Sequence, residues 1–347
     1  MKKDSSNTKE DRIKRFKNIL EQDLKGFRIS HFILSPSIYV LLRIYHRYVR
    51  FNGLEKVDWN RPQILVPSHQ NALMDPFLVI SALRYIPSQY TYPLIRADVY
   101  ENSILRSIVT DFHMIPVFRP QDRSDIASSN AAVFELCQDL LARNYNLLIH
   151  AEGNCIPRKK IRVFKKGFSR IAFGAEEKHN FELGLDIVPI NINYYSIFDW
   201  GTPVEVTFND PIAVKDYEDK YKDTPLKAIA QLTNDVHSIV ESGSVNIKDL
   251  NKSSLLEDCI ANIDQSSSKE ERFERHISIA DSINSFSEKK YNYLEKKNSQ
   301  VASNLERLGL EREYFSLEKI SVTMALRAFI AAAIFLPIYI FGLVHHY

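Results

Sequence analysis

The feature that most constrains this chain is a regular alternation of short apolar runs with helical segments, between about residues 60 and 230. Continuous apolar runs of about four to eight residues are typical of strands buried on both faces. Strands that alternate with helices favour an α/β structure, a mostly parallel sheet flanked by helices. The runs expected to be strands are 64–66, 90–95, 115–118, 147–150 and 187–193, with 204–208 as an edge strand.

Charge and hydropathy divide the 347 residues into four predicted parts. At about 150 residues per domain, the length itself leaves room for about two compact units. We expect a charged N-terminus with an amphipathic membrane-interface helix (1–55), an α/β domain (56–242), a polar C-terminal helical segment (243–323) and a C-terminal transmembrane helix as anchor (324–347).

Residues 31–51 are expected to form the membrane-interface helix. Apolar side chains are accompanied there by aromatic residues and by Arg43, Arg47 and Arg50 at helical spacing. A helix of this kind suits the membrane surface, where aromatic rings lie at headgroup level and arginines meet anionic lipid. The apolar run is too short to span a bilayer, and Pro36 interrupts it. The alternative is a helix that packs on its own domain.

The C-terminal region is the predicted anchor, because residues 328–344 contain no charged side chain. A helix of that length spans about 25 Å, close to the ~30 Å of a bilayer's hydrocarbon core. Lys319 and Arg327 precede it, so the positive-inside rule predicts a membrane protein with its active domain on the cytoplasmic face. A buried core helix is the alternative.

Composition and missing motifs exclude several classes of protein. The formal charge of +2 gives no case for a general nucleic-acid binder. Cys137, Cys155 and Cys259 form no CxxC pair, so neither a disulfide framework nor a four-thiolate zinc site is expected. The motifs of serine hydrolases, P-loop NTPases, dinucleotide-binding proteins and HExxH zinc proteases are absent. We therefore expect no metal and no resident cofactor, and the oligomeric state stays open.

The segment PSHQNALMDPF carries the candidate catalytic pair. His69 directly follows a predicted strand, and Asp75 comes after five intervening residues, where the next helix would begin. Ligands bind at strand-end loops of α/β sheets, and a histidine oriented by a carboxylate is a general base. Two alternatives stay open: an aspartate that caps a helix beside a structural histidine, and a metal pair, which lacks a third ligand at a diagnostic spacing.

A dense basic run follows Glu152 and Gly153. Seven cations fall within thirteen positions that hold no acidic residue: Arg158, Lys159, Lys160, Arg162, Lys165, Lys166 and Arg170. Gly167 and Phe168 then precede a helix of small residues, whose positive N-terminus would lie near the site. The run could bind phosphate groups or anionic lipid headgroups, or it could be a solvated loop.

Other marked residues are expected to be structural. His113 and His150 flank predicted strands, and Cys155 has no partner histidine that the sequence places beside it. Four aromatic residues are expected to pack in the core or to line an apolar ligand: Tyr194, Tyr195, Phe198 and Trp200.

Four blocks in order resemble those of the 1-acylglycerol-3-phosphate and glycerol-3-phosphate acyltransferases, the glycerolipid acyltransferase family. They are the segment from His69 to Asp75, MIPVFRP with Arg119, the Glu152-Gly153 pair, and IVPINI at 187–192. The resemblance covers about residues 60–215. The family's usual first block has four residues between histidine and aspartate, and its third block usually continues with Thr-Arg, where this chain has Asn-Cys. The longer first block, with Asn71, resembles a subgroup that includes fungal glycerol-3-phosphate acyltransferases.

The resemblance implies a membrane-bound acyltransferase of phospholipid biosynthesis. It would move a fatty acyl group from acyl-CoA or acyl-ACP to a hydroxyl of glycerol 3-phosphate, with His69 as general base oriented by Asp75. The substrate-binding residues implied are Asn71, Arg119, Glu152, Gly153, Arg158, Lys165, Lys166 and Gly167. The expected partners are membrane lipids and the acyl thioester, with no nucleic acid. The alternatives are an acyltransferase for lysophosphatidate or another lysophospholipid, a hydrolase that uses water, and a non-enzymatic lipid-binding protein on the same fold.

Overall fold

The computed structural model describes residues 29–72, 74–83, 91–101, 112–118, 126–263 and 271–309. Its elements in chain order are α2 Ile29–Tyr45, β1 Val49–Asn52, η1 Leu54–Lys56, β2 Gln63–Pro67, α3 Met74–Leu83, β3 Thr91–Arg96, α4 Ala97–Glu101, β4 Ile115–Val117, α6 Ile126–Ala142, β5 Asn146–Leu148, α7 Gly167–Lys178, β6 Asp186–Tyr194, β7 Val204–Phe208, β8 Ile212–Ala213, η2 Val214–Tyr217, α8 Glu218–Asp223, α9 Pro225–Ser242, η3 Leu250–Lys252, α10 Ser253–Ile263, α11 Arg272–Ser285 and α12 Glu288–Arg307. The predicted charged N-terminus up to residue 28 and the predicted anchor at 324–347 lie outside the described residues. Within those ranges, no helix has the length and apolar character needed to cross a membrane.

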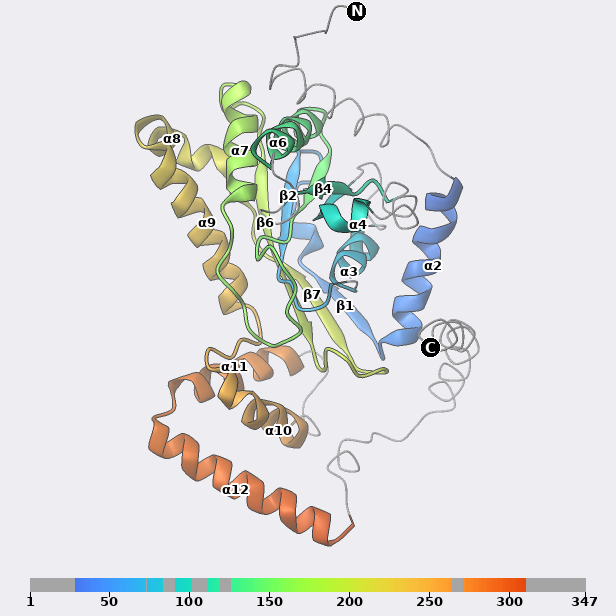
Figure 1. Cartoon of the computed structure of the whole chain (residues 1–347), viewed down its shortest axis with the longest axis vertical. Coiled ribbons are helices and arrows are strands. Elements are labelled where there is room, and N and C mark those ends of the chain that lie inside the picture. The colour runs from blue at the N-terminus through green and yellow to red at the C-terminus, as the bar shows by residue number, and fades with distance from the viewer. Residues whose placement is uncertain are drawn as a thin grey trace, which may run out of the picture.

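A mostly parallel sheet flanked by helices organises the chain, as the alternating pattern predicts (Figure 1). The strand order is β1-β7-β6-β2-β5-β3-β4, and β8 pairs with the beginning of β6. Strands β6, β2, β5, β3 and β4 run parallel to one another. Their carboxyl ends therefore meet at one edge of the sheet, which is where α/β proteins place their ligands.

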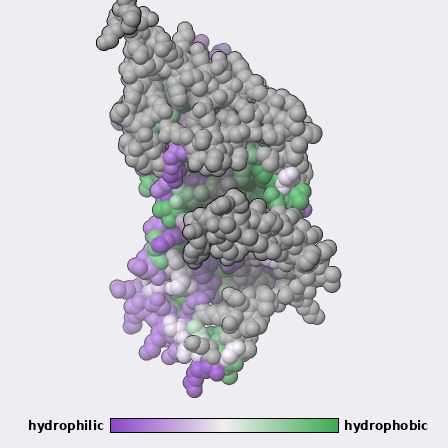
Figure 2. Space-filling view, turned by 45° about the vertical axis from the view of Figure 1, so that its right-hand side comes forward, coloured by the Kyte–Doolittle hydropathy of each residue, from purple (hydrophilic) through white to green (hydrophobic). Residues whose placement is uncertain are grey.

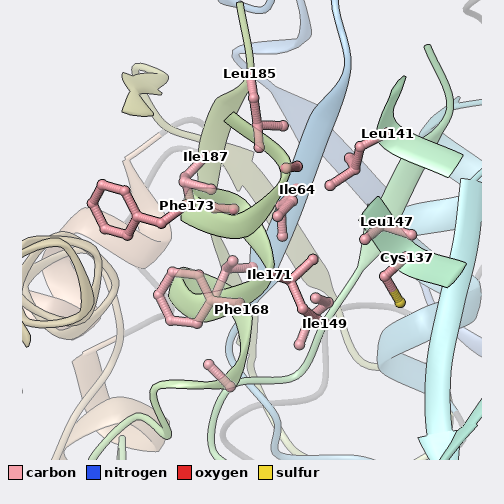
Figure 3. Close-up of a cluster of buried hydrophobic side chains, with 14 of the residues drawn as sticks. Ile64, Cys137, Leu141, Leu147, Ile149, Phe168, Ile171, Phe173, Leu185 and Ile187 are labelled. Atoms are coloured by element: carbon pink, nitrogen blue, oxygen red, sulfur yellow. The ribbon is translucent and has the colours of Figure 1, made fainter. Parts of the chain in front are cut away.

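Helices cover both faces of the sheet because the side chains of each strand alternate between the faces. On β2, Ile64 and Val66 face a core that includes residues of α6, α7 and α9. Leu65 faces the opposite core, which includes residues of α2 and α3. Figure 3 shows side chains of α7, Phe168 and Ile171 among them, on the first of these faces beside Ile64. Burial on both sides explains why the strands are continuous apolar runs in the sequence.

The prediction of a single helix over residues 31–51 is wrong at its C-terminal end. Helix α2 ends at Tyr45, and the segment from Val49 becomes strand β1, which pairs in parallel with β7. Arg50 therefore lies on a strand, where its guanidinium forms an ion pair with Glu205 at 3.4 Å. A strand of four residues is too short to show the alternation of apolar and polar side chains that identifies a strand in a sequence. The helical spacing of Arg43, Arg47 and Arg50 is therefore a coincidence.

The same strand corrects the prediction that residues 204–208 form an edge. Strand β7 lies between β1 and β6, and four of its five residues are buried. The sequence pattern predicts a helix where β1 lies, so it predicts no strand that could pair with the outer side of β7.

Helices α10, α11 and α12 lie together in the lower part of Figure 1. They have a small core of their own. Its buried apolar residues are Val245, Ile247, Leu255, Leu256, Ile260, Phe273, Ala280, Ile283 and Tyr291. An ion pair of 2.7 Å from Lys159 to Glu257 and a 3.0 Å hydrogen bond from Arg272 to the Tyr48 hydroxyl join this unit to the α/β part.

Candidate active site

The loop after β2 holds the predicted histidine and aspartate together. His69 Nδ1 lies 3.0 Å from Asp75 Oδ2, and the same oxygen accepts the backbone N–H groups of Gln70 and Asn71, each at 2.8 Å. Three donors around one oxygen suit a carboxylate, so the ring proton belongs on Nδ1, and Nε2 is left as the acceptor. The His69 side chain is 12% exposed, whereas Asp75 is fully buried. This arrangement suits an oriented general base.

Asn71 caps the helix that follows the loop. Its Oδ1 accepts the backbone N–H of Met74 at 3.2 Å, the usual way an asparagine begins a helix. The Asp75 carboxylate instead contacts His69 and the backbone N–H groups of the loop. The alternative that Asp75 serves only as a helix cap is therefore not supported. The Asn71 amide also donates to the Ile197 carbonyl at 3.4 Å. A contact of Asn71 with substrate stays a prediction.

Tyr194 is a site residue whose role sequence reasoning missed. It ends β6, the strand next to β2, and its hydroxyl donates to Asp75 Oδ1 at 2.5 Å. Burial, together with the charge of Asp75, raises the pKa of Tyr194 well above its usual value, so the hydroxyl keeps its proton. The two residues are 119 positions apart, and only the pairing of their strands could have revealed the contact.

Glu152 supports the His69 loop from the turn after β5. Its Oε1 accepts the backbone N–H of His69 at 2.7 Å, and its Oε2 accepts from Arg162 Nε at 2.8 Å. The carboxylate is completely buried, and burial raises the pKa of Glu152 while the Arg162 charge opposes that shift. Arg162, counted in the sequence as one cation among seven, is therefore an internal partner of the site.

Gly153 makes the turn that directs Glu152 inward. Its φ of +78° lies in the left-handed region that favours glycine, and its N–H donates to the His150 carbonyl at 3.1 Å. Lys165 returns to this turn, where its backbone N–H donates to the Ala151 carbonyl at 2.7 Å. The first residues of α7 therefore lie near the predicted site, with Lys166 directly before Gly167 at the start of that helix.

The basic run separates into internal and surface cations. Lys159 is buried and donates both to Glu257 and to the Tyr195 carbonyl, each at 2.7 Å. The exposed cations are Arg158, Lys165, Lys166 and Arg170. Phosphate binding by these exposed cations stays a prediction. The predicted phosphate ligand Arg119 lies outside the described residues.

His150 lies against the candidate base. Its ring stacks on that of His69, with centroids 3.9 Å apart and planes 21° apart. Burial lowers the pKa of His150 well below its usual value, and the nearby His69 lowers it further. A neutral His150 can support the His69 ring without adding a second charge beside it.

A thiol nucleophile is not favoured at Cys155. Burial is the main cause that raises the pKa of Cys155 to about 11, and the Asp75 charge adds to it, so this thiol is protonated at neutral pH. Across the described part of the chain, no group of three or more metal-ligating side chains is found.

We expect Tyr194→Phe to lower kcat by about tenfold to a hundredfold, because a hydrogen bond to a charged group contributes about 1.5–3 kcal/mol. Steady-state kinetics and chemical unfolding of the same preparation measure the effects on catalysis and on stability. Tyr217→Phe is the matched control, since its hydroxyl donates to Asp235 at 2.7 Å away from the His69 loop. The control should lose stability and keep its kcat; equal kcat values for the two variants would show that Tyr194 only supports the fold.

Comparison with known proteins finds a family match over the α/β part. A family profile named Acyltransferase matches residues 48–193, which include the His69 loop and the Glu152 turn. The match ends at Asn193, directly before Tyr194. No curated protein matches the chain closely enough to count as a relative.

One solved structure with some similarity is the crystal structure of the 1-acyl-sn-glycerophosphate (LPA) acyltransferase PlsC from Thermotoga maritima. The similarity covers 67% of this chain and 81% of that chain, with 15% identity and a TM-score of 0.41. A TM-score of that size does not establish a shared fold, so the assignment depends on the sequence match.

The matched range contains all four blocks that suggested the family, from the His69 loop to the Val-Pro segment at 187–192. Residues 48–193 are accordingly an acyltransferase domain, and the chain that carries it is an acyltransferase.

Proposed function

We propose that this acyltransferase moves a fatty acyl group from acyl-CoA or acyl-ACP to a hydroxyl of glycerol 3-phosphate at a membrane surface. The observation that carries the proposal is the 3.0 Å contact of His69 with an aspartate whose two oxygens are held by other donors. A histidine held in this way can act on a substrate hydroxyl without an enzyme nucleophile.

The proposed reaction needs one proton carrier. His69 Nε2 takes the proton of the acceptor hydroxyl while the hydroxyl oxygen attacks the carbonyl carbon of the thioester. The new C–O bond forms, the C–S bond breaks, and the proton passes from His69 to the departing thiolate. Asp75 stabilises the imidazolium that exists between these two transfers, as the acid of a Ser-His-Asp triad does.

Membrane association is part of the proposal because of the substrates. An acyl chain of lipid length gains about 0.8 kcal/mol per buried methylene, so it stays in the bilayer. Figure 2 shows hydrophobic residues gathered on the side of the molecule that carries α2 in Figure 1. On that helix Val40 is 52% exposed. A cytoplasmic orientation remains a proposal that depends on the sequence alone.

The test is a parallel assay of the full chain with each acceptor and each thioester. Glycerol 3-phosphate, dihydroxyacetone phosphate and lysophosphatidate are offered with acyl-CoA or acyl-ACP, and the acylated products are separated and counted. We expect the highest kcat/KM with glycerol 3-phosphate. A preference for lysophosphatidate would favour the alternative acceptor, and release of free fatty acid without any acylated product would show a hydrolase.

A further inference from the structure

We propose that two neighbouring loops beside His69 contact an anionic lipid bilayer directly and insert apolar side chains into it. The loops are residues 154–163 and 196–202, called here the rim loops. The inference depends on the proposed function in one respect, namely that the acyl substrate is presented at a membrane. It adds which surface of the protein meets that membrane.

The first observation is a concentration of exposed apolar side chains. Nine large hydrophobic side chains are exposed among the described residues, and four of them lie on the rim loops. They are Val163 at 81% exposed, Phe198 at 69%, Ile156 at 41% and Trp200 at 38%. Single exposed apolar residues are ordinary, but four of them on two loops that are joined to the same site indicate an interaction surface.

The second observation is that the rim loops lie together at the candidate active site. The buried Lys159 of the first loop donates to the carbonyl of Tyr195, directly before the second loop. Asn71, from the His69 loop, donates to the Ile197 carbonyl at 3.4 Å. Arg162 also lies on the first loop, and its ion pair with Glu152 connects it to the support of His69.

The third observation is that the second rim loop is held at its backbone while its aromatic side chains stay exposed. The Tyr45 hydroxyl donates to the Phe198 carbonyl at 3.0 Å, and the Gly201 N–H donates to the Tyr45 carbonyl at 2.8 Å. The loop is thereby attached to the end of α2. Exposure of Phe198 and Trp200 is therefore compatible with an ordered loop.

The charges around these side chains favour an anionic bilayer. Residues 154–166 contain six basic residues and no acidic one, and Arg158, Lys165 and Lys166 are exposed. Residues 196–202 contain a single acid, Asp199. Basic residues beside aromatic and aliphatic ones are typical of surfaces that bind anionic lipid headgroups and insert shallowly. An acidic carrier protein would satisfy the cations but would give no reason for four exposed apolar side chains.

Trp200 provides a direct probe because the chain contains only one other tryptophan, Trp59. In the full-length Trp59→Phe variant, tryptophan emission comes from Trp200 alone. With vesicles of phosphatidylcholine and phosphatidylglycerol, we expect a blue shift, and quenching when the acyl chains are brominated. The Trp200→Phe variant is the control, because Trp59 donates to the Leu54 carbonyl and packs against Phe208. Emission from Trp59 should be unchanged by the brominated lipid.

A second measurement compares apolar side chains of similar exposure. Val163→Ser and Phe198→Ser should each weaken vesicle binding by about tenfold, since these side chains lose their contact with the bilayer interior. Leu226→Ser, on α9, replaces a side chain that is 75% exposed and should leave binding unchanged. Val163→Ser and Leu226→Ser should keep their rate with a short-chain, water-soluble thioester and glycerol 3-phosphate, which reports the proposed function separately.

Three outcomes would overturn the inference. Protein that is bound to vesicles without quenching of Trp200 would mean that another surface meets the lipid. Absence of any vesicle binding would mean that no surface of the protein binds the lipid. Weakened use of acyl-ACP by Val163→Ser and Phe198→Ser, with vesicle binding intact, would identify the rim loops as a protein-docking surface.

Discussion

His69→Ala is expected to lower kcat by about 10²- to 10⁴-fold, which is the usual contribution of a positioned general base. The effect should be confined to catalysis. In the variant, Asp75 Oδ2 keeps the N–H groups of Gln70 and Asn71, and Oδ1 keeps the Tyr194 hydroxyl. The buried carboxylate therefore still has its donors, and the free energy of unfolding should change little. Single-turnover kinetics with a radiolabelled thioester and chemical unfolding measure the two effects.

His150→Phe is the matched control for this prediction. Phenylalanine preserves a flat ring against His69 and removes a group that burial already keeps neutral. We expect this variant to keep kcat within about threefold, because the neutral His150 ring transfers no proton in the proposed reaction. If His69→Ala kept nearly full activity while His150→Phe lost most of it, the assignment of the base to His69 would be wrong.

The parts of the site that are local could be predicted from the sequence. His69 and Asp75 share one loop, so the strand before and the helix after the loop were enough to bring them together. The buried strands were recognisable for a similar reason, because burial on both faces makes each one a continuous apolar run. Strand β1 was missed because it is four residues long and its arginine continued a helical spacing.

The parts of the site that depend on strand order could not be predicted. Tyr194 reaches Asp75 because β6 lies beside β2, and Glu152 reaches the His69 backbone because β5 lies on the other side of β2. Apolar runs indicate which segments are strands but not which strands are neighbours. For the same reason, no local pattern could distinguish the internal cation Arg162 from the surface cation Arg158.

Arg162→Met is expected to lower the free energy of unfolding by about 3–5 kcal/mol, the usual cost of leaving a buried charge without its partner. Glu152 is completely buried and Arg162 is 19% exposed, so solvent can replace little of the lost interaction. We also expect kcat to fall by at least about tenfold, because Glu152 holds the backbone of His69 at 2.7 Å. Chemical unfolding and steady-state kinetics measure the two changes.

Arg61→Met is the matched control, since Arg61 pairs at 2.6 Å with Asp186, whose side chain is 3% exposed, at the opposite end of β6 from Tyr194. It should lose stability and keep its kcat. If both variants kept full activity, the Glu152–Arg162 pair would be a support of the fold alone.

The pH dependence of Arg162→Met separates a lost charge from lost packing. Burial already raises the pKa of Glu152, and without the Arg162 charge only hydrogen bonds from the backbone N–H groups of residues 69 and 162 still oppose that shift. A carboxyl group whose folded pKa exceeds its unfolded pKa binds more protons when folded, so its stability deficit grows as pH rises between the two values. The deficit of Arg162→Met should therefore be smallest at about pH 4, the ordinary pKa of a glutamate, and largest above the folded pKa of Glu152. Adding Glu152→Gln should remove this pH dependence, because the buried group then carries no charge at any pH; a deficit that stayed constant with pH would instead assign the loss to the packing of the arginine side chain.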